Sequence, residues 1–511
     1  MLRKIRITAS VVLFSLITLY FLDFTNTIPR KFSLVAKIQL VPALLSLNVV
    51  ILISLLLLTL IFGRVYCSSI CPMGVYQDIA AWFSKKVNKK RHTRKKYTYS
   101  PAKTFLRISI LVLTIAAFLF GFTFLVGLLD PYGAYGRMTT HLFRPVYLAG
   151  NNVLQSIFTR FGNYTFYKVS IYSLGVISTA IALATLLIIG FLAWQNGRTY
   201  CNTICPVGTV LGYISKFSLY KIQFDEEKCN ACGLCANNCK SSCINSKSHE
   251  IDYSRCVDCF DCIESCNRSA IKYAPRKIKS QKGQKNSEVN EIDESKRRFL
   301  SATAIGAIAA TNLMAQKTGL PLTKEIKRKT PIAPPGSISI EHLKDKCISC
   351  HLCISKCPSH VIKPAFMEYG LSGMMQPVMY YDHGFCNYDC TLCSDVCPTE
   401  AISPLTKEQK HTTQMGKVHF IIENCIVYKD ETNCGACSEH CPTQAVSMIP
   451  YKNSLTIPHT DTSICVGCGG CEYVCPAKPH KAIYVEGLDV QNKVKFKKEK
   501  HEQVIINDFG F

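Results

Sequence analysis

The chain divides into long apolar runs within its first 200 residues and a polar, cysteine-rich remainder. The apolar runs cover residues 7–22, about 43–62, about 105–129 and 169–193. Each run is apolar on all sides, and each is long enough, or nearly so, for an α-helix that crosses a bilayer. No small-residue cleavage site follows the first run, so we expect a retained span there. The pattern therefore predicts four membrane-spanning helices.

Basic residues in the short loops predict the orientation of these helices. They precede the first run at Arg3, Lys4 and Arg6. More follow between the second and third runs, at Lys85, Lys86, Lys89, Lys90, Arg91, Arg94, Lys95, Lys96 and Lys103. We expect both segments to face the cytoplasm and residues 130–168 to lie outside. The alternative for the basic loop is a patch that binds anionic lipid or nucleic acid.

A short sequence is repeated at the predicted cytoplasmic ends of the second and fourth runs. Residues 63–74 (GRVYCSSICPMG) and 197–208 (GRTYCNTICPVG) share the pattern GRxYCxxICPxG. This duplication implies two similar halves of one bundle. The spacing puts both thiols of a copy on one helical face, before a proline that turns the chain. The cysteines are candidates for one shared metal centre or for redox dithiols, the alternative being buried, inert thiols: Cys67, Cys71, Cys201 and Cys205.

Beyond Lys228 the remaining cysteines fall into quartets, with Cys243 left over. Most quartets read C-x2-C-x2-C-x3-C, the bacterial ferredoxin run that binds [4Fe–4S] clusters, and two widen only the first gap. Zinc is the alternative for any single CxxC pair. We therefore expect six [4Fe–4S] clusters. The quartets are Cys229, Cys232, Cys235 and Cys239; Cys256, Cys259, Cys262 and Cys266; Cys347, Cys350, Cys353 and Cys357; Cys386, Cys390, Cys393 and Cys397; Cys425, Cys434, Cys437 and Cys441; and Cys465, Cys468, Cys471 and Cys475.

The fourth cysteine of such a run binds the neighbouring cluster, so clusters occur in close pairs. For the first two quartets, this predicts that Cys266 joins the first three cysteines of the first run and that Cys239 joins those of the second. The last four quartets leave a nested and a sequential pairing open. His351, His440 and His480 lie beside quartets, and we expect them to be solvent-facing loop residues.

The net charge of +24 does not indicate nucleic-acid binding. Each oxidised four-iron cluster on four thiolates carries about −2, which lowers the net charge to roughly +12. What remains lies in membrane-flanking loops with few interleaved aromatic residues. The chain also shows no Rossmann glycine motif, P-loop or HExxH.

The two cysteine-rich regions are joined by a polar, basic linker at residues 271–298. It ends at Arg297-Arg298-Phe299-Leu300, before a weakly apolar, alanine-rich stretch that reaches about Ala315. This pattern favours a twin-arginine export signal, which would carry the last four clusters across the membrane already folded. A surface or core helix is the alternative. A retained signal would form a fifth anchor.

These motifs resemble a known family. The duplicated CxxxCP on a four-span core, with two ferredoxin motifs after it, resembles NapH-type membrane polyferredoxins and is similar to the membrane domains of NosR and CcoG relatives. The part from Arg298 onward looks like the exported NapG/MauM-type ferredoxin. The first quartet pair departs from the pattern, with Lys240 and Asn267 in the places of proline.

The resemblance implies an α-helical membrane bundle of four spans, or five with the anchor, plus α+β ferredoxin-like [4Fe–4S] modules. We expect a membrane domain at 1–215, a two-cluster module at 216–275 in the cytoplasm, a linker and export segment at 276–335, and a four-cluster module at 336–511 in the periplasm. It also implies a quinol dehydrogenase subunit of the cytoplasmic membrane that passes electrons to an extracytoplasmic reductase or cytochrome. The rivals are a redox accessory for metalloenzyme maturation and a wire fed by cytoplasmic ferredoxin.

No quinone site can be identified from the sequence. The segment Asp130–Arg137, with His141 and Arg144, contains groups that could accept protons from quinol. We expect instead a turn and a helix start with interfacial aromatic residues, because Asp-Pro-Tyr-Gly is typical of turns.

Overall fold

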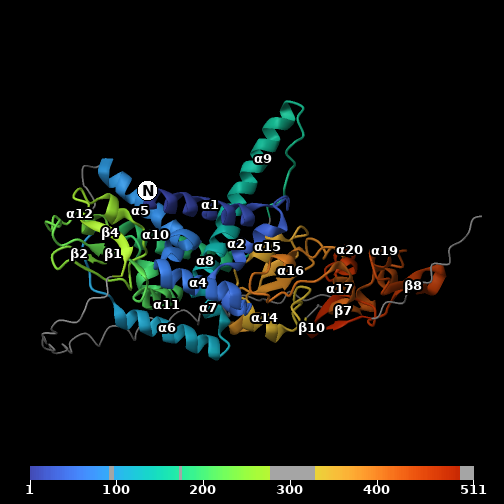
Figure 1. Ribbon diagram of the computed structural model, residues 1–511. Coiled ribbons are helices and arrows are strands. Elements are labelled where there is room, and N and C mark those ends of the chain that lie inside the picture. Colours follow the sequence, from blue (N-terminus) through green and yellow to red (C-terminus); the bar gives the residue numbers. More distant parts are fainter. Residues whose placement is uncertain (91–96, 172–174, 277–327, 495–511) are drawn as a thin grey trace, which may run out of the picture.

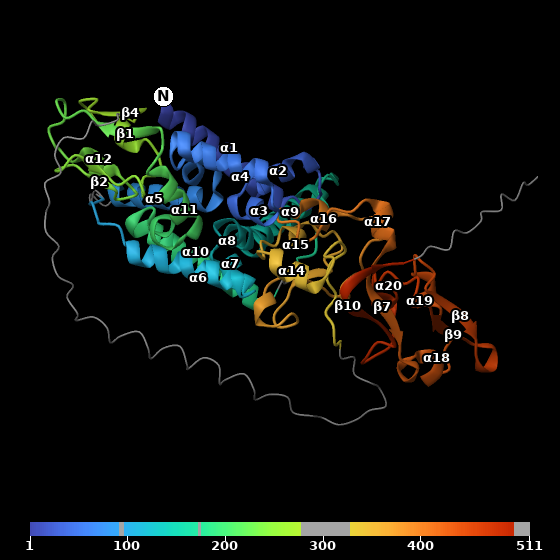
Figure 2. The same cartoon turned by 60° about the horizontal axis from the view of Figure 1, so that its bottom comes forward.

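The molecule consists of three parts in a line: a helical bundle with a cysteine-rich module at each end (Figures 1 and 2). The computed structural model describes residues 1–90, 97–171, 175–276 and 328–494. We call residues 220–276 the first module and residues 328–494 the second module. The linker beyond residue 276, the Arg297-Arg298 pair and the expected fifth anchor lie outside the described residues.

Each predicted span contains a helix, but within the described ranges only two helices have the length and hydropathy to cross a bilayer alone. These are α1 (Leu2–Leu22) and α10 (Val176–Asn196), each about 31 Å long at 1.5 Å per residue. The second run is divided into α3 (Leu40–Leu45) and α4 (Val49–Phe62). The third is divided into α6 (Thr104–Leu119) and α7 (Thr123–Leu129), with Gly121 at positive φ between them.

The long helices expose much of their apolar surface. Only 28% of the most apolar window of α1 and 22% of that of α10 are buried. On α10, Leu187, Ile188 and Phe191 are each about 60% exposed. Soluble proteins rarely expose apolar surface on this scale, whereas a bilayer would cover it.

Shorter helices fill the interior and ends of the bundle. They are α2 (Leu34–Lys37), α5 (Pro72–Lys90), α8 (Pro131–Met138), α9 (Arg144–Arg160) and α11 (Pro206–Ser215). Helix α5 packs along α10, and α11 packs along α4, so the two sequence repeats occupy equivalent places. Helix α9 projects sideways from the bundle, near its junction with the second module (Figure 1).

The first module is a small α+β unit closed by an antiparallel pair of strands. Strand β1 (Tyr220–Phe224) pairs with β4 (Ile271–Pro275), so the ends of the module lie together beside the bundle. Between them are α12 (Leu234–Asn238), the pair β2 (Ile244–Asn245) and β3 (Glu250–Ile251), and α13 (Asp261–Glu264).

The second module contains two consecutive halves. Its elements are α14 (Ile340–Lys346), α15 (Leu352–Lys356), β5 (Ile362–Pro364), β6 (Pro377–Met379), α16 (Leu392–Val396), α17 (Lys407–Thr412), β7 (Thr413–Phe420), α18 (Ile426–Lys429), α19 (Ala436–Glu439), β8 (Val446–Pro450), β9 (Thr456–Thr460), α20 (Gly470–Val474) and β10 (Ile483–Lys493). Strands pair antiparallel as β5–β6, β7–β10 and β8–β9. Residues 328–335 already pack here, since the amide of Gly487 donates to the carbonyl of Thr330.

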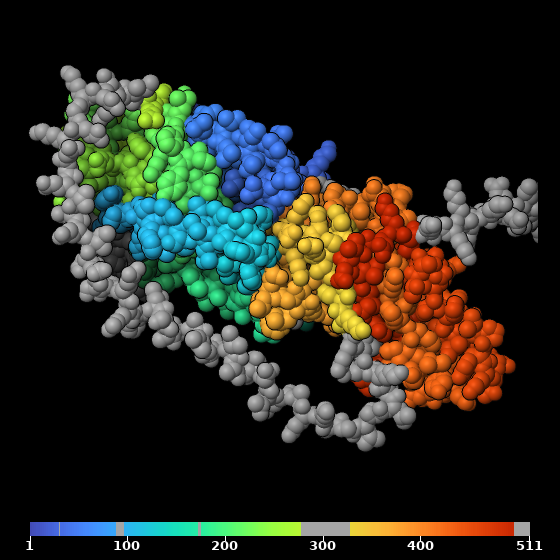
Figure 3. Space-filling view, turned by 90° about the horizontal axis from the view of Figure 1, so that it is seen from below, coloured from blue at the N-terminus to red at the C-terminus, as the bar shows by residue number. Residues whose placement is uncertain are grey.

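Helix α8 forms the floor on which the second module rests. Arg137, fully buried, donates from its guanidinium to the carbonyls of Gly127 (2.9 Å) and Ser349 (3.1 Å). A Cβ at Gly136 would lie 2.4 Å from the carbonyl oxygen of Cys350, so only glycine allows this approach. Seen from below, the cyan surface of α6 and α7 continues into that of the second module (Figure 3), which α7 contacts.

Two further buried contacts join α1 and the segment after α8 to the second module. Lys356 donates to the Asp23 carboxylate at 2.7 Å, and both side chains are at most 5% exposed. His351 donates from Nε2 to the carbonyl of Met375, so its Nδ1 accepts from Nε2 of His141 at 2.7 Å. Both interactions are shielded from water, so they fix the module in one position.

Two expectations about this region need correction. Asp130 caps α8 and Pro131 starts it, as expected of a turn, but residues 130–141 are buried under the second module rather than interfacial. His351 is only 2% exposed and pairs with His141, so it is not a solvent-facing loop residue. Neither contact could be foreseen, because the partner residues are more than 200 positions apart.

Replacing Arg137 should loosen the second module from the bundle. Arg137→Met leaves the carbonyls of Gly127 and Ser349 without their buried donor, at a cost of about 2–4 kcal/mol. Hydrogen exchange should then accelerate at the amides around Cys350 and stay unchanged in the first module. Arg160→Met, at the exposed end of α9, is the matched control. Equal exchange in the two variants would contradict this role.

Candidate metal centres

The repeated CxxxCP sequence has the same backbone in both copies. In each copy, the backbone reverses at a glycine with positive φ, Gly63 or Gly197. It then forms a single π-helical turn, Tyr66–Ile70 or Tyr200–Ile204. The first cysteine lies within that turn. The second, in extended conformation, precedes the proline that starts α5 or α11. Single π turns inside helical segments often mark functional sites.

Two buried arginines cross between the repeats. Arg64 donates to the carbonyl of Cys201 at 3.2 Å, and Arg198 donates to that of Cys67 at 2.6 Å. Each guanidinium also lies near a thiol, 3.7 Å from Sγ of Cys67 for Arg64 and 4.0 Å from Sγ of Cys201 for Arg198. The reciprocal contacts hold the two halves of the bundle together and place positive charge beside the thiols.

Glycines at the end of each repeat make this crossing possible. A Cβ at Gly74 would lie 2.1 Å from the carbonyl oxygen of Cys67, and one at Gly208 would lie 2.2 Å from that of Cys201. The same positions face the crossing guanidiniums. A side chain at either glycine would collide with the cysteine backbone and with the crossing arginine, so the repeat needs all three residue types together.

A charge network joins this centre to the first module. Asp78 on α5 binds Arg6 and Arg198 at 2.8 Å and Lys240 at 3.1 Å. Burial opposes the charged form, but these three cations hold the pKa of Asp78 far below its usual value. Lys240 also binds Asp261, which explains why lysine occupies this place in the first quartet.

Loops of the two modules curve in the way that iron–sulfur loops require. In four of the quartets, the residues just before and just after the second cysteine have positive φ. They are Ala231 and Gly233, Asp258 and Phe260, Ser349 and His351, and Gly467 and Gly469. Such alternation turns successive backbone N–H groups toward one side, forming a concavity that suits anions and iron–sulfur clusters.

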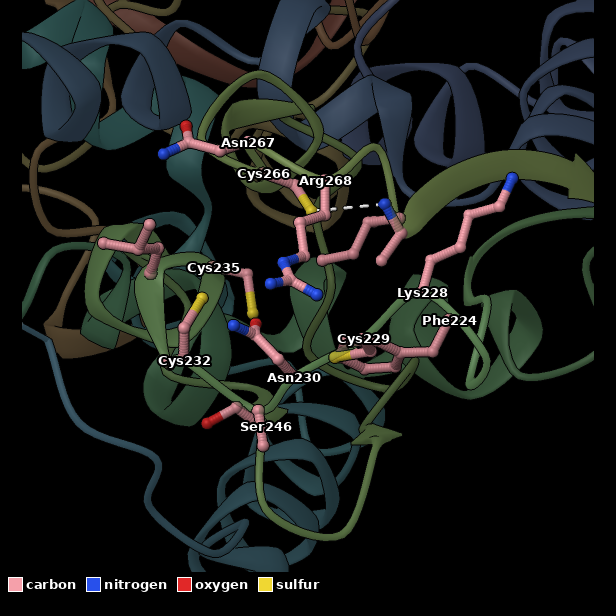
Figure 4. Close-up of a pocket in the computed structure, with 15 residues that line it drawn as sticks. Phe224, Lys228, Cys229, Asn230, Cys232, Cys235, Ser246, Cys266, Asn267 and Arg268 are labelled. Atoms are coloured by element: carbon pink, nitrogen blue, oxygen red, sulfur yellow. Dashed lines mark hydrogen bonds between the residues drawn. The ribbon is translucent and has the colours of Figure 1, made fainter.

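The first module brings together the cysteines that the sequence pairs. Cys229, Cys232, Cys235 and Cys266 surround a cavity of about 170 Å³ (Figure 4). Their sulfurs lie around its centre, and the amide of Ala270 donates to Sγ of Cys266 at 3.3 Å. Cys239 lies instead among the cysteines of the second run: burial raises the pKa of the Cys262 thiol, and Cys259, Cys256 and Cys239 raise it further, ahead of Cys235.

The second module pairs its quartets sequentially, which the sequence left open. Burial raises the pKa of the Cys353 thiol well above its usual value, and neighbouring thiolates raise it further. The same pattern holds for Cys393 and Cys471. The groups are Cys347, Cys350, Cys353 and Cys397; Cys386, Cys390, Cys393 and Cys357; Cys425, Cys434, Cys437 and Cys475; and Cys465, Cys468, Cys471 and Cys441.

With pKa values raised in this way, the thiols stay protonated unless positive charge is supplied at close range, as an iron core would supply it. Among the described residues, no three His, Cys, Asp or Glu side chains converge closely enough to hold a single metal ion. A cubane makes a different demand, because each thiolate binds its own iron at a separate corner. The cysteine-lined cavities and the loop curvature both fit [4Fe–4S] clusters.

The cysteine groups follow one another along the molecule. Cys259 and Cys350 both pack against the bundle core that contains Cys67, Cys71, Cys201 and Cys205. Farther out, the amide of Cys386 donates to the carbonyl of Cys468 at 2.9 Å and joins the two halves of the second module. Cys232, at the other end, is exposed to solvent.

Cys243, the unassigned cysteine, lies inside the first module. Its sulfur is 3.5 Å from that of Cys239, and it is 1% exposed. Arg64, Arg198 and Asp78 were likewise not predicted from the sequence to be part of a site. The Gly-Arg pair that begins both repeats is the sequence feature from which the two arginines could have been identified.

Serine variants test the exchange of the fourth cysteines in the first module. Cys232→Ser and Cys266→Ser should alter the same EPR signal of the reduced protein, and Cys239→Ser and Cys259→Ser should alter a different one. Cys243→Ser is the matched control and should keep the full iron content. If Cys266→Ser instead altered the EPR signal that Cys259→Ser alters, the result would contradict the grouping.

Two family models match parts of the chain. One, described as a 4Fe-4S binding domain, matches residues 46–90 and 176–224, which contain both CxxxCP repeats. The other, described as a 4Fe-4S dicluster domain, matches residues 346–401 and 432–478, the two halves of the second module. No solved structure matches the chain significantly.

Curated relatives are similar over parts of their length. The putative electron transport protein YccM of Escherichia coli is 24% identical over 46% of this chain, and the ferredoxin-type protein NapH of Haemophilus influenzae is 25% identical over 42%. The chain spans 57% and 63% of their lengths. The methylamine utilization ferredoxin-type protein MauM of Methylobacillus flagellatus is 26% identical over 38% of this chain and 86% of its own. The chain is thus an iron–sulfur protein with 4Fe-4S domains, similar to NapH and MauM.

Proposed function

We propose that the protein is a membrane-bound electron-transfer chain that oxidises quinol and delivers the electrons to an acceptor outside the cytoplasm. One observation carries this proposal: both modules dock on opposite ends of one bundle, and a single buried core reaches a cysteine group of each. An arrangement of this kind suits electron steps through the bundle rather than around it. Six [4Fe–4S] clusters would occupy the six groups of the modules, and the chain would join NapH-like and MauM-like parts.

The four bundle cysteines would hold a further iron–sulfur centre shared by the two repeats. Support comes from the match of the 4Fe-4S binding domain model to both repeats, and from the two arginines that lie beside the thiols. When bound, such a centre exchanges single electrons. The four cysteines would hold it in a buried site that excludes water. Arg64 and Arg198 would fix the two repeats around it and offset the thiolate charge.

Quinol is the donor that fits a protein with long, apolar, exposed helices. Quinol is lipid-soluble and releases two electrons and two protons on oxidation, whereas iron–sulfur centres accept electrons singly. The apolar surfaces of α1 and α10 would place the bundle in the bilayer that contains this donor. The second module would then face the outside and deliver electrons to a reductase or cytochrome.

One observation favours a second candidate. The Cys229 group lies at the free end of the first module, where Cys232 is exposed and the cavity is open (Figure 4). A soluble one-electron carrier could reach this group from the cytoplasm. The chain would then work as a wire fed by a ferredoxin of low potential.

Anaerobic titration separates the two candidates. The purified protein in detergent should lose a substantial share of its visible iron–sulfur absorbance when a reduced menaquinol analogue is added, and dithionite gives the full-reduction reference. Cys201→Ala should lower the share that quinol reduces, because it breaks the centre between the repeats. Bleaching by reduced ferredoxin or dithionite alone would contradict quinol oxidation and support the wire.

The proposed orientation has its own test. In sealed, right-side-out vesicles, an impermeant amine reagent should modify the exposed Lys452 of the second module and spare Lys228 of the first until the membrane is opened. The basic loop around Lys85 and the position of the first module at that end of the bundle both support this result. Labelling of Lys228 alone would reverse the proposed topology.

A further inference from the structure

A groove lies where α1 ends and α9 begins. It has a volume of about 310 Å³, within the range of small-molecule sites. One wall is the end of α1 and the loop after it, including Leu19, Leu22 and Phe24. The other is formed by Tyr147 on α9 and by Phe166 and Tyr167 on the returning segment, so aromatic rings face the space from both sides.

Aromatic contacts tie the two walls together. The ring of Phe24 lies 6.1 Å from that of Tyr147 and 5.8 Å from that of Tyr167, centroid to centroid. Asn151 donates to the carbonyl of Tyr167 at 3.0 Å and fixes the returning segment on α9. The groove is thus a preformed feature whose lining also includes polar side chains, those of Thr25, Asn151 and Thr165.

Helix α9, which forms one wall of this groove, exposes an apolar surface of its own. It projects across the direction of α1 and α10 at the second-module end of the bundle (Figures 1 and 2). Its apolar residues recur at helical spacing and are exposed, with Val146 at 72%, Val153 at 59% and Ile157 at 46%. A helix of this kind lies in the plane of a membrane interface. A lipid-soluble molecule could therefore enter the groove from the bilayer.

An ion pair connects the groove to the second module. Asp23 lines the groove, and its buried carboxylate accepts from Lys356 at 2.7 Å. Lys356 directly precedes Cys357, which lies in the group of Cys386 and Cys393. Through this ion pair, the groove contacts α15, and the residue that ends this helix, Cys357, belongs to a proposed cluster of the second module.

We propose that this groove binds the ring of a quinol, with the aromatic side chains stacked against it and its hydroxyls at the polar side chains of Thr25, Asn151 and Thr165. The inference rests on the proposed function and adds the place where the donor binds. Oxidation there would break two O–H bonds, release two protons to water on this face, and pass two electrons one at a time to the [4Fe–4S] centres of the second module. The quinol would leave as quinone.

Aromatic substitutions test the site by binding. The probe is 2-heptyl-4-hydroxyquinoline N-oxide, a quinol analogue whose fluorescence is quenched on binding to protein. Phe24→Ala and Tyr147→Ala should each weaken its binding about tenfold, as expected for loss of one stacking partner. Phe161→Ala and Tyr164→Ala are matched controls, since these rings are 83% and 78% exposed near the end of α9 and should leave binding unchanged.

A second variant keeps the test independent of stacking. Thr165→Trp should fill the groove and block the probe, while an unchanged visible absorbance that dithionite still bleaches shows that the clusters and fold persist. Unchanged binding in Phe24→Ala, Tyr147→Ala and Thr165→Trp would overturn the site, even if quinol still reduces the clusters. Equal weakening by the control variants would also overturn it. Probe binding at the groove without any reduction by quinol would instead defeat the proposed function.

Discussion

The burial of cysteine thiols in groups of four is the constraint on which the rest of this structure depends. Thiolates that share a buried site repel one another, so each group needs positive charge at close range. In the modules, backbone N–H groups turned inward by positive-φ residues such as Ala231 and Gly233 contribute part of this charge. In the bundle, Arg64 and Arg198 do so with whole guanidinium groups. The loops, the glycines and the crossing arginines are consequences of this one requirement.

Buried cations also fix the distances between the cysteine groups. Lys240 holds the first module against Asp78 of the bundle, and Arg137 and Lys356 hold the second module against the opposite end. Each of these side chains is shielded from water, so its contacts cannot be exchanged for solvent without a large cost. A rigid junction of this kind suits electron transfer, because the spacing of the centres stays constant.

The docking of the second module on the bundle also explains why α8 is buried. The segment has the sequence of a turn followed by a short helix, and it forms both. Its complete burial follows from the second module, whose loop around Cys350 lies directly on Gly136. The same contact brings a cysteine group of the second module to the core that contains the CxxxCP repeats. A segment that would be an outer loop in an isolated bundle is thereby an internal layer.

The sequence by itself determined the local chemistry: the ferredoxin loops, the duplicated CxxxCP turns, the apolar helices and the exchange of Cys266 and Cys239 between neighbouring groups. These features depend on spacing within a few dozen residues, where chain geometry leaves few alternatives. Only the tertiary structure decided the sequential pairing in the second module, the crossing of Arg64 and Arg198, the burial of His351 and the groove beside Phe24. Each of these depends on contacts between distant segments, whose partners are chosen by packing and by the burial of charge rather than by any local pattern.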